Sequence, residues 1–549
     1  MSDDILARTS GAFAAGSGGS AAARLLGRPA LWLPPLWMAA LLFYLPTYLH
    51  SDVSWYLVAT ERFVSGARLY QDVIEVNPPL AFYLMAPPVL AADMTGMPSR
   101  MLFVSYVFLL LGLSLWLVDR LLRQMSDVAD SARGAFLLAV FGALVLLPLP
   151  VFGQREHLML ILSIPYILLL GHRLAGRGCS TMLAVAVGAA AAVGIGLKPY
   201  FVLAPALLEL YLMAVRRSPA AALRAESLTL LAGLTAYVAL AAFLNPEYFT
   251  FMLPYARLVY DAYSSSLVDV LTQPEVFILL LPACAFALAR SAGAADRRSD
   301  ALVIAGAGFF VGYVLQSKGW DYHLLPAGVA IFLAVAWILI ALLARAVPAN
   351  PARRPQLIAW SAAALALLAF APVIRGPFNN PFTDKLLPIV EKYAAGGAIY
   401  AFTSHVWVGF PLVNEAGVGW SSRFPTQWLL PGARLKLANA ATLDPGTKAK
   451  LQEIERYVTD AVAEDFGRLP PDLVIVDTDN PYMREANFDY LAYFQRDPRF
   501  ARLWQSYVKI GEVSLAIGAS PLSEGTKRVF DLWCRKSETH ACPALAGPG

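Results

Sequence analysis

Long apolar runs recur along residues 31–374 and constrain the fold of this chain more than any other feature. Each run has about 17 to 22 residues, and a helix of about 20 apolar residues crosses the roughly 30 Å hydrocarbon core of a bilayer. The 549 residues are 58% hydrophobic and only 15% charged, whereas soluble domains are about 25% charged. The chain is therefore predicted to be a polytopic α-helical membrane protein.

About eleven segments are predicted to be transmembrane helices. They are residues 31–49, 101–119, 134–151, 157–171, 181–197, 199–215, 226–244, 273–290, 301–316, 323–344 and 356–374. Together they form a predicted membrane domain over 30–375, with a long external loop at 50–100. Within that loop, the apolar segment 80–97 is short and contains two prolines, so we interpret it as interfacial or re-entrant. The small, polar residues 1–29 predict a disordered cytosolic leader.

Arginines concentrate in alternate connections between the predicted helices. They are Arg24, Arg28, Arg120, Arg123, Arg133, Arg173, Arg177, Arg216, Arg217, Arg224, Arg290, Arg297, Arg298, Arg345, Arg353 and Arg354. Because Lys and Arg are enriched in cytoplasmic loops, these connections are predicted to face the cytoplasm. The other connections, and everything after Arg375, are then predicted to lie on the external side.

Residues 376–549 differ from the rest because charged residues and turn signals return. Short β-rich runs occupy 397–402, 472–478 and 507–518, and the pattern of 446–465 is typical of a helix. This mixture predicts a small α/β domain on the outer face. Cys534 and Cys542 lie close together in it, and they could form a disulfide if the tail is outside the cytosol.

The predicted external loops hold an unusual set of polar residues near the first and fourth spans. Asp52 follows the first span directly, and Glu75 lies further along the same loop. The short connection "GQREH" contains Arg155, Glu156 and His157. Polar groups at the mouth of apolar helices are costly unless they line an aqueous cavity. We therefore expect these side chains to take part in a site.

Further basic and aromatic residues lie in the other external connections. Lys198 and Lys318 are the only lysines before Arg375, and Lys198 stands at the edge of an apolar run in "GLKPYF". Lys318 begins "KGWDYHLLP", which also contains Tyr322 and His323, and Arg257 lies in another long external loop. We expect these bases to gather with the acids on one external face.

Each of these residues also has an ordinary structural interpretation. Ser51 and Asp52 form a natural helix N-cap. Arg155 and Glu156 could be a surface ion pair, which contributes little energy. Lys198 could extend to the lipid headgroups, as lysines at helix ends do.

The sequence specifies neither a metal site nor a nucleotide site. His157, His323 and His405 share no ligand spacing, and no Gly-rich loop follows a strand as nucleotide binding requires. The formal net charge of +4 is small and spread out, which gives no case for binding nucleic acid.

Several short motifs together resemble those of the GT-C glycosyltransferases. They are "SDVSWY" (51–56), "EVNPPL" (75–80), "GQREHLML" (153–160), "GLKPY" (196–200) and "KGWDYHLLP" (318–326). Within that superfamily the chain looks most similar to the lipid A aminoarabinose transferase and protein O-mannosyltransferase branch. With the external tail domain, the resemblance covers the whole architecture. The stretch 403–431 matches no acceptor motif.

The resemblance implies an inverting transfer of a sugar from a polyprenyl phosphate to a hydroxyl group on a glycan, lipid or protein. It implies that Asp52 is the catalytic base and that Lys198 binds the donor phosphate. Arg155, Lys318 and Arg257 would assist Lys198 in binding the phosphate. The residues that would position the sugar or the acceptor are Glu75, Glu156, His157, Tyr322 and His323. The site and the tail domain would face the periplasm of a bacterial inner membrane. The superfamily includes metal-dependent and metal-independent enzymes, so a divalent metal is compatible with it.

Two other classes of protein share some of these features. A flippase or exporter of lipid-linked saccharides would also gather charge in an outer cavity, but it needs polar residues through the spans, which are almost uncharged here. A non-catalytic protein of envelope assembly would leave the external acids dispersed. The identities of the sugar and the acceptor do not follow from the sequence.

Overall fold

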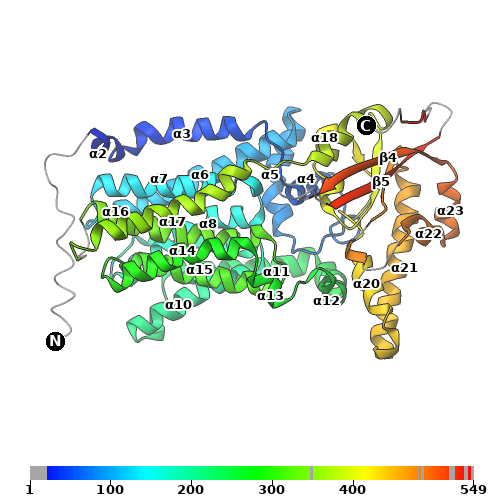
Figure 1. The fold of residues 1–549 in the computed structure, drawn as a ribbon. Coiled ribbons are helices and arrows are strands. Elements are labelled where there is room, and N and C mark those ends of the chain that lie inside the picture. The colour runs from blue at the N-terminus through cyan, green and yellow to red at the C-terminus, as the bar shows by residue number, and fades with distance from the viewer. Residues whose placement is uncertain are drawn as a thin grey trace. The chain divides into compact units, whose positions relative to one another are not determined.

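The computed structural model describes residues 21–345, 350–479, 481–483, 488–517, 526–536 and 542–545. It divides into two compact units (Figure 1). The helical unit takes the chain up to Thr47, Met101–Leu240 and Ser265–Phe378. The mixed unit takes Tyr48–Arg100, Ala241–Ser264 and the chain from Asn379 onward.

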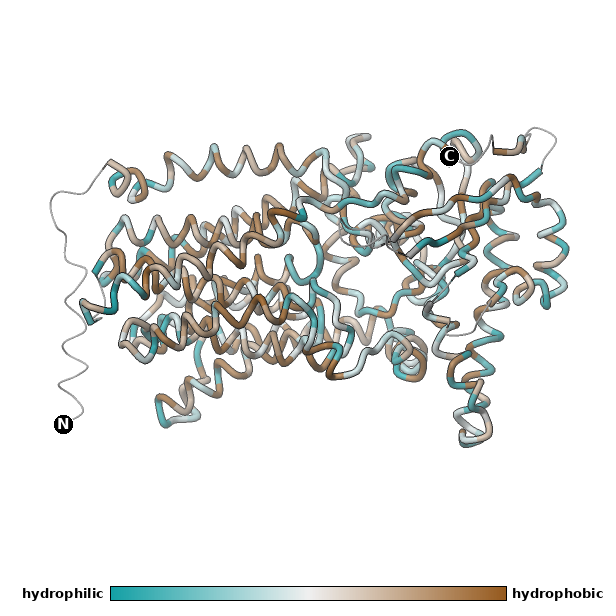
Figure 2. The backbone as a smooth tube through the Cα atoms, in the orientation of Figure 1, coloured by the Kyte–Doolittle hydropathy of each residue, from teal (hydrophilic) through white to brown (hydrophobic). Residues whose placement is uncertain are grey.

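The helical unit is built from the predicted membrane segments. Its helices are α2 (Ala21–Leu26), α3 (Pro29–Tyr44), α6 (Ser99–Arg123), α7 (Asp130–Leu146), α8 (Arg155–Leu174), α9 (Thr181–Gly196), α10 (Leu203–Arg216), α11 (Ala225–Leu244), α13 (Leu267–Leu271), α14 (Pro274–Ser291), α15 (Arg297–Gln316), α16 (Leu325–Leu343) and α17 (Arg354–Arg375). Short 3₁₀ turns are η1 (Leu149–Val151), η2 (Pro199–Val202), η3 (Pro219–Ala222) and η6 (Asp321–His323). Hydrophobic residues dominate these helices in Figure 2.

Every predicted span corresponds to a helix, and the chain is a multi-pass membrane protein. In the described residues, eight helices are long and apolar enough to cross a bilayer. The segments α3 and α9 are apolar but have 16 residues each, and α7 has 17. The end of the predicted disordered leader is instead helical, because the Ala-rich run of α2 favours helix formation. Residues 1–20 of that leader lie outside the described residues.

Helix α8 forms the centre of the helical unit. In its apolar window 94% of residues are buried, against 11% for α11. A helix buried all round is a core element. Glycines allow its neighbours to approach closely: a Cβ at Gly194 of α9 would lie 3.0 Å from the Met159 carbonyl oxygen of α8. Small residues at such contacts are typical of membrane helix packing.

The mixed unit joins the long external loop to the C-terminal tail. Its helices are α4 (Ser51–Val64), α5 (Leu80–Thr95), α12 (Leu253–Val259), α18 (Pro381–Tyr393), α19 (Leu412–Ala416), α20 (Leu429–Leu437), α21 (Pro445–Arg468), α22 (Tyr490–Phe494) and α23 (Pro498–Trp504). Shorter helical turns are η4 (Tyr248–Met252), η5 (Tyr260–Tyr263), η7 (Val406–Val408), η8 (Ala440–Thr442) and η9 (Pro481–Met483). The apolar segment at 80–97 is the 16-residue helix α5, and its interfacial or re-entrant placement stays a prediction.

A five-stranded sheet lies at the core of the mixed unit. Its strands are β1 (Ala398–Phe402), β2 (Gly419–Trp420), β3 (Leu473–Asp477), β4 (Tyr507–Ile517) and β5 (Thr526–Arg535), in the order β2-β1-β3-β5-β4. The pairs β1–β2 and β1–β3 are parallel, and β5 is antiparallel to β3 and β4. Strands β1 and β3 are buried along their whole length. The predicted strands and the helix at 446–465 are therefore confirmed.

One disulfide closes the end of the described tail. Cys534 of β5 is bonded to Cys542, the pair whose bonding the sequence left open. Cys534 is fully buried and pairs in register with Leu473 of β3. The bond therefore fixes the chain that follows the last strand to the core of the sheet.

Candidate functional site

A buried cluster of acid and base lies in the helical unit. It consists of Glu156 in the first turn of α8, Lys198 just before η2, and His323 at the end of η6. The Lys198 ammonium group contacts the Glu156 Oε1 atom and lies 3.2 Å from His323 Nε2. The distance from His323 Nε2 to Glu156 Oε1 is 3.7 Å. The predicted gathering of these three side chains is therefore present in the structure.

The local backbone explains why Lys198 points inward. Pro199 disfavours a helical conformation in the preceding residue, and Lys198 accordingly has φ −146° and ψ 138°. The break separates α9 from η2 and turns the lysine side chain into the protein, where it is only 5% exposed. Because its ammonium group contacts Glu156, Lys198 does not extend to the lipid headgroups.

Glu156 is also placed by its helix. It is the second residue of α8, where a helix N-terminus favours a carboxylate. It is fully buried, and the described chain offers no hydrogen-bond partner to its Oε2 atom. A buried carboxylate with one unsatisfied oxygen is costly, so this atom is suited to accept a hydrogen bond from a bound ligand.

His323 is held in its neutral form. Burial lowers its pKa well below the ordinary value, and the positive charges of Lys198, Arg155 and Lys318 lower it further. A neutral imidazole can accept a hydrogen bond from Lys198 through Nε2 and carry its proton on Nδ1. In the described residues Nδ1 has no partner, which leaves one donor available.

Of the remaining predicted bases and aromatics, three act on the buried cluster and one belongs to the mixed unit. Tyr322 is buried, and its ring centroid lies 5.4 Å from Lys198 Nζ, within cation–π range. Arg155 is buried and Lys318 half-buried, and the charges of both act on His323. Arg257 is exposed on α12 of the mixed unit.

His157 takes no part in this cluster. It is fully buried, its Nδ1 accepts a hydrogen bond from the Gly153 backbone N–H at 3.1 Å, and its Nε2 lies 2.8 Å from the Leu144 carbonyl oxygen. Both ring nitrogens are therefore bonded to backbone groups. His157 fixes the turn that precedes α8, and we do not retain it as a residue that positions sugar or acceptor.

The mixed unit carries the other two predicted acids. Asp52 is half-buried in the first turn of α4. The N-cap of α4 is His50, whose Nδ1 accepts the Asp52 backbone N–H at 3.2 Å. The interpretation of Ser51 and Asp52 as the N-cap is therefore wrong. The cap is His50, and Ser51 and Asp52 are the first two residues of the helix.

Glu75 is buried and firmly held. Its Oε2 accepts the Trp55 indole N–H at 2.8 Å, and its Oε1 accepts the Asn77 backbone N–H at 3.1 Å and the Asn77 side-chain amide at 2.5 Å. Trp55 and Asn77 were not predicted as site residues. Both lie within the quoted motifs "SDVSWY" and "EVNPPL", so the motifs contained the signal.

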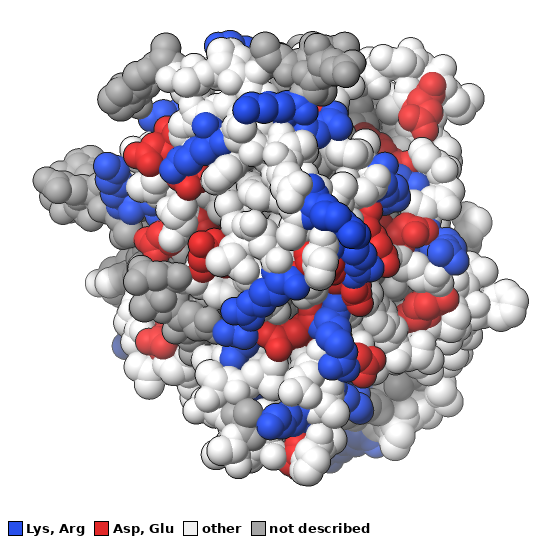
Figure 3. Space-filling view, turned by 90° about the vertical axis from the view of Figure 1, so that its right-hand side faces the viewer, with Lys and Arg blue, Asp and Glu red and all other residues white. Residues whose placement is uncertain are grey.

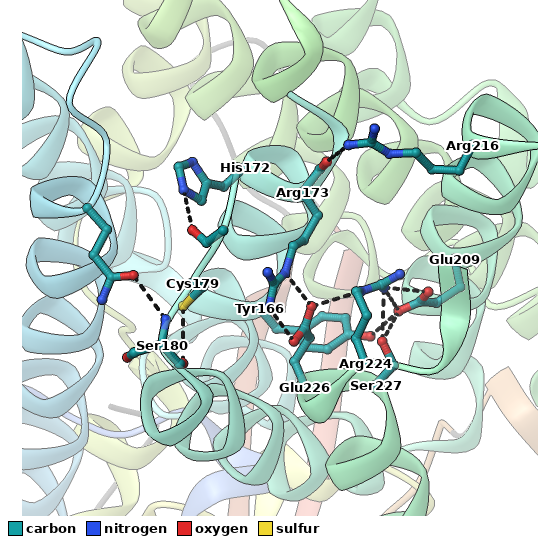
Figure 4. Close-up of polar contacts among 12 residues, drawn as sticks. Tyr166, His172, Arg173, Cys179, Ser180, Glu209, Arg216, Arg224, Glu226 and Ser227 are labelled. Carbon is teal, nitrogen blue, oxygen red and sulfur yellow. Dashed lines mark hydrogen bonds and ion pairs between the residues drawn. The ribbon is translucent and has the colours of Figure 1, made fainter. Parts of the chain in front are cut away.

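A second ion network lies near the other end of α8 (Figure 4). Arg173 binds the fully buried Glu226 through two hydrogen bonds of 2.8 and 3.0 Å. Arg224 binds Glu226 and Glu209, and Tyr166 donates to Glu209 at 2.8 Å. Arg173 and Arg224 belong to the arginines predicted to be cytoplasmic. The acids neutralise them, so the network ties α8, α10 and α11 together.

A metal site is not evident in the described part of the chain. It contains no group of three or more His, Cys, Asp or Glu side chains that could hold an ion.

Comparison with known proteins identifies the fold. No family model matches the sequence, and no curated protein matches it. Among solved structures, apo ArnT from Cupriavidus metallidurans is similar with a TM-score of 0.50 and 12% identity, over 91% of this chain and 98% of that one. The same protein bound to undecaprenyl phosphate gives a TM-score of 0.46 and 14% identity, over 93% and 98%. Arabinofuranosyltransferase AftD from Mycobacteria gives 0.41 and 15%, over 93% of this chain and 40% of that one. The likeness to apo ArnT shows that the chain has the fold of a GT-C glycosyltransferase.

Proposed function

We propose that this protein is an inverting glycosyltransferase of the periplasmic face of a bacterial inner membrane. It moves a sugar from a polyprenyl phosphate to a hydroxyl group of an envelope glycan, lipid or protein. The observation that carries the proposal is the buried cluster around Lys198 on a fold of the GT-C type. The quoted sequence motifs support the choice of donor.

The charge balance of the cluster fits the phosphate of such a donor. Lys198, Arg155 and Lys318 all act on His323, and Glu156 is the acid in contact with Lys198. The positive charges of these three residues therefore reach the same buried imidazole, beside the ion pair of Lys198 and Glu156. Pre-organised positive charge of this kind stabilises a leaving phosphate.

In the proposed reaction the acceptor hydroxyl oxygen attacks the anomeric carbon of the sugar. A bond forms between these two atoms while the bond from the anomeric carbon to the phosphate oxygen breaks. Asp52 takes the hydroxyl proton as general base, and polyprenyl phosphate leaves with the bonding electrons. Lys198 balances the negative charge that develops on the leaving phosphate, and Glu156 holds Lys198 in place when no donor is bound.

Two further features support the periplasmic orientation. The arginines of the alternate connections predict, by the positive-inside rule, that those connections face the cytoplasm. The disulfide between Cys534 and Cys542 belongs to an oxidising compartment, and the periplasm is one.

The experiment compares cells with and without the protein. We expect loss of the protein to remove one sugar from an envelope molecule and to accumulate the corresponding polyprenyl-phosphate sugar, both detected by mass spectrometry. The wild-type chain should restore transfer. Asp52→Asn should not, although the variant inserts normally, because an amide cannot accept the proton. An unchanged envelope with no accumulated donor would overturn the proposal, and activity of Asp52→Asn would remove Asp52 from the base role.

A further inference from the structure

A second polar cavity lies wholly within the mixed unit. It has a volume of about 570 Å³, in the range of sites for small molecules. Three separate parts of the chain form it: the loop after α4, η4 with the residue before it, and the tail domain from Arg423 to Arg468. None of the residues proposed for the reaction lines it.

The lining combines aromatic rings with balanced charges. Phe251 and Tyr457 pack edge to face with ring centroids 5.1 Å apart, and Tyr70 adds a third ring. The charged lining residues are three arginines and three acids: Arg68, Arg423, Arg468, Asp72, Glu247 and Glu464. Positive and negative side chains are also interspersed on the face shown in Figure 3. Balanced charge does not favour a phosphate group, which prefers net positive charge.

This combination fits a saccharide. The C–H face of a sugar ring is apolar and packs on aromatic rings, while its hydroxyl groups bind carboxylates, amides and guanidinium groups. Burial raises the pKa of the Tyr457 phenol to about 12, although Arg423 acts against the shift. The phenol therefore keeps its proton near neutral pH and can donate to a ring or hydroxyl oxygen.

The polar walls of the cavity are fixed in place by their own contacts. The Gln71 amide donates to Glu247 Oε1 at 2.6 Å, which joins the loop to the segment before η4. Arg423 binds Asp465 at 3.0 Å and Glu464 at 2.8 Å. Side chains held this way lose little conformational entropy when a ligand binds.

A chain of contacts connects the cavity to the helix that carries Asp52. Tyr70 has φ 65°, a left-handed conformation that is rare for a bulky residue and costs free energy. Its hydroxyl donates to the Asn77 carbonyl oxygen at 2.8 Å. Asn77 in turn holds Glu75, which accepts the indole N–H of Trp55 on α4. The strained loop thus links the cavity wall to α4.

We propose that this cavity binds the glycan of the acceptor. The inference rests on the proposed function, because it names where the acceptor of that reaction is recognised. The recognised chemistry is a neutral or zwitterionic saccharide, whether it belongs to a lipid, a polysaccharide or a glycoprotein.

Another charged cavity in the mixed unit serves as a matched control. It has a volume of about 690 Å³ and is lined by residues from α20 to α23. Its Arg499 is bound to Asp460 and Asp497. Its lining contains one aromatic ring, Tyr493, and none of the loop after α4.

The experiment uses the full-length purified protein. The probe is the soluble glycan released by mild acid from envelopes of cells that lack the protein, with lipid-derived, polysaccharide and glycoprotein fractions assayed separately. Phe251→Ala and Glu247→Gln alter the cavity, Tyr457→Phe keeps the ring, and Asp460→Asn is the control. Binding of the fluorescently labelled glycan is measured beside the transfer kinetics.

We expect Phe251→Ala to raise the acceptor KM about tenfold, equivalent to about 1.4 kcal/mol, with the donor KM unchanged. Glu247→Gln should weaken glycan binding in the same direction without removing any packed group, so it remains informative if Phe251→Ala misfolds. Tyr457→Phe should have a smaller effect than Phe251→Ala, and Asp460→Asn none. The fraction that binds identifies the source of the glycan.

Acceptor binding unchanged in both Phe251→Ala and Glu247→Gln would overturn the inference, as would an effect on the donor KM alone. If the wild-type protein consumes no polyprenyl-phosphate sugar, the proposed function fails by itself. The binding measurement still tests the cavity in that case. If the wild type binds the glycan and Glu247→Gln does not, the cavity is a saccharide site.

Discussion

At the scale of single residues, Lys198 is the side chain on which the proposed chemistry depends most. Its ammonium group is buried against Glu156, and a neutral His323 lies next to both of them. Burying two ions costs free energy that their attraction does not fully return. A pair kept under that cost is consistent with a role in binding rather than in stability.

The first prediction concerns this pair. Lys198→Met and Glu156→Gln should each leave one buried charge uncompensated and lower stability by about 3–5 kcal/mol. The double variant should be milder than the sum of the two, because both charges are gone. Thermal unfolding of the four proteins in detergent measures the coupling. Strictly additive losses would contradict the buried ion pair, and activity is expected to be absent in both proteins that lack Lys198.

The second prediction concerns pH and His405 in the tail domain. Burial, with Arg528 acting in the same direction, lowers the pKa of His405 from 6.5 to about 3. As the pH falls below about 6.5, the unfolded chain therefore binds a proton that the folded chain excludes, and stability falls until about pH 3. His405→Phe keeps a ring beside Tyr482. Between pH 7 and 4.5, the melting temperature of this variant should fall less than that of the wild type. Identical pH profiles would contradict the prediction.

At the scale of elements, close packing of the membrane helices depends on a few glycines. A Cβ at Gly308 of α15 would lie 2.5 Å from the Cα and 2.8 Å from the backbone nitrogen of Ala204 in α10. Both contacts are with backbone atoms, so α10 and α15 would have to move apart to remove the steric clash. Gly142 of α7 has no atom within 4 Å of the same position.

The third prediction uses these two glycines as a pair. Gly308→Ala should lower stability by about 1–3 kcal/mol, the usual effect of overpacking. Gly142→Ala should be neutral or stabilise by up to about 1 kcal/mol, since alanine favours helix more than glycine. Melting temperatures in one detergent provide the measurement. Equal effects of the two substitutions would show that α10 and α15 do not pack through Gly308.

The elements also show what a sequence can and cannot reveal. The membrane helices were predictable because a bilayer requires long apolar runs, and β1 and β3 because they are short and continuously apolar. Strand β5 was not predictable, because charged residues interrupt its apolar pattern: Lys527, Arg528, Asp531 and Arg535. The buried side of the strand does show the alternation of a strand, with Arg528, Phe530, Leu532 and Cys534. Pairing with β3 and β4, rather than composition, explains why it is a strand.

The same limit applies to the candidate site. The sequence placed Glu156, Lys198 and His323 in external connections, but Glu156 and Lys198 are 42 residues apart and Lys198 and His323 are 125 apart. Only the packing of α8 with its neighbours shows that they touch. Conversely, His157 follows Glu156 directly yet bonds the backbone. Neighbouring positions on a helix face different directions, so adjacency in the sequence did not predict a shared role.

At the scale of the whole molecule, the proposed function requires one orientation in the membrane. The helical unit contributes arginine-rich connections, and the mixed unit contributes a disulfide-bonded tail. The arginines and the disulfide are independent signals, because one depends on insertion and the other on redox chemistry. The first predicts that the arginine-rich connections face the cytoplasm, and the second predicts that the tail lies in an oxidising compartment.

The fourth prediction tests that orientation by labelling. Lys448→Cys in α21 and Arg217→Cys after α10 place a thiol at exposed positions of the tail and of an arginine-rich connection. A membrane-impermeant maleimide applied to cells with a permeabilised outer membrane should label the Lys448→Cys protein and not the Arg217→Cys protein. After the inner membrane is also permeabilised, both should react. Cys534 and Cys542 should react only after reduction, and the free Cys179 serves as an internal reference. Labelling of Arg217→Cys in cells with an intact inner membrane would reverse the orientation, and Asp52 and the tail could then not act in the periplasm.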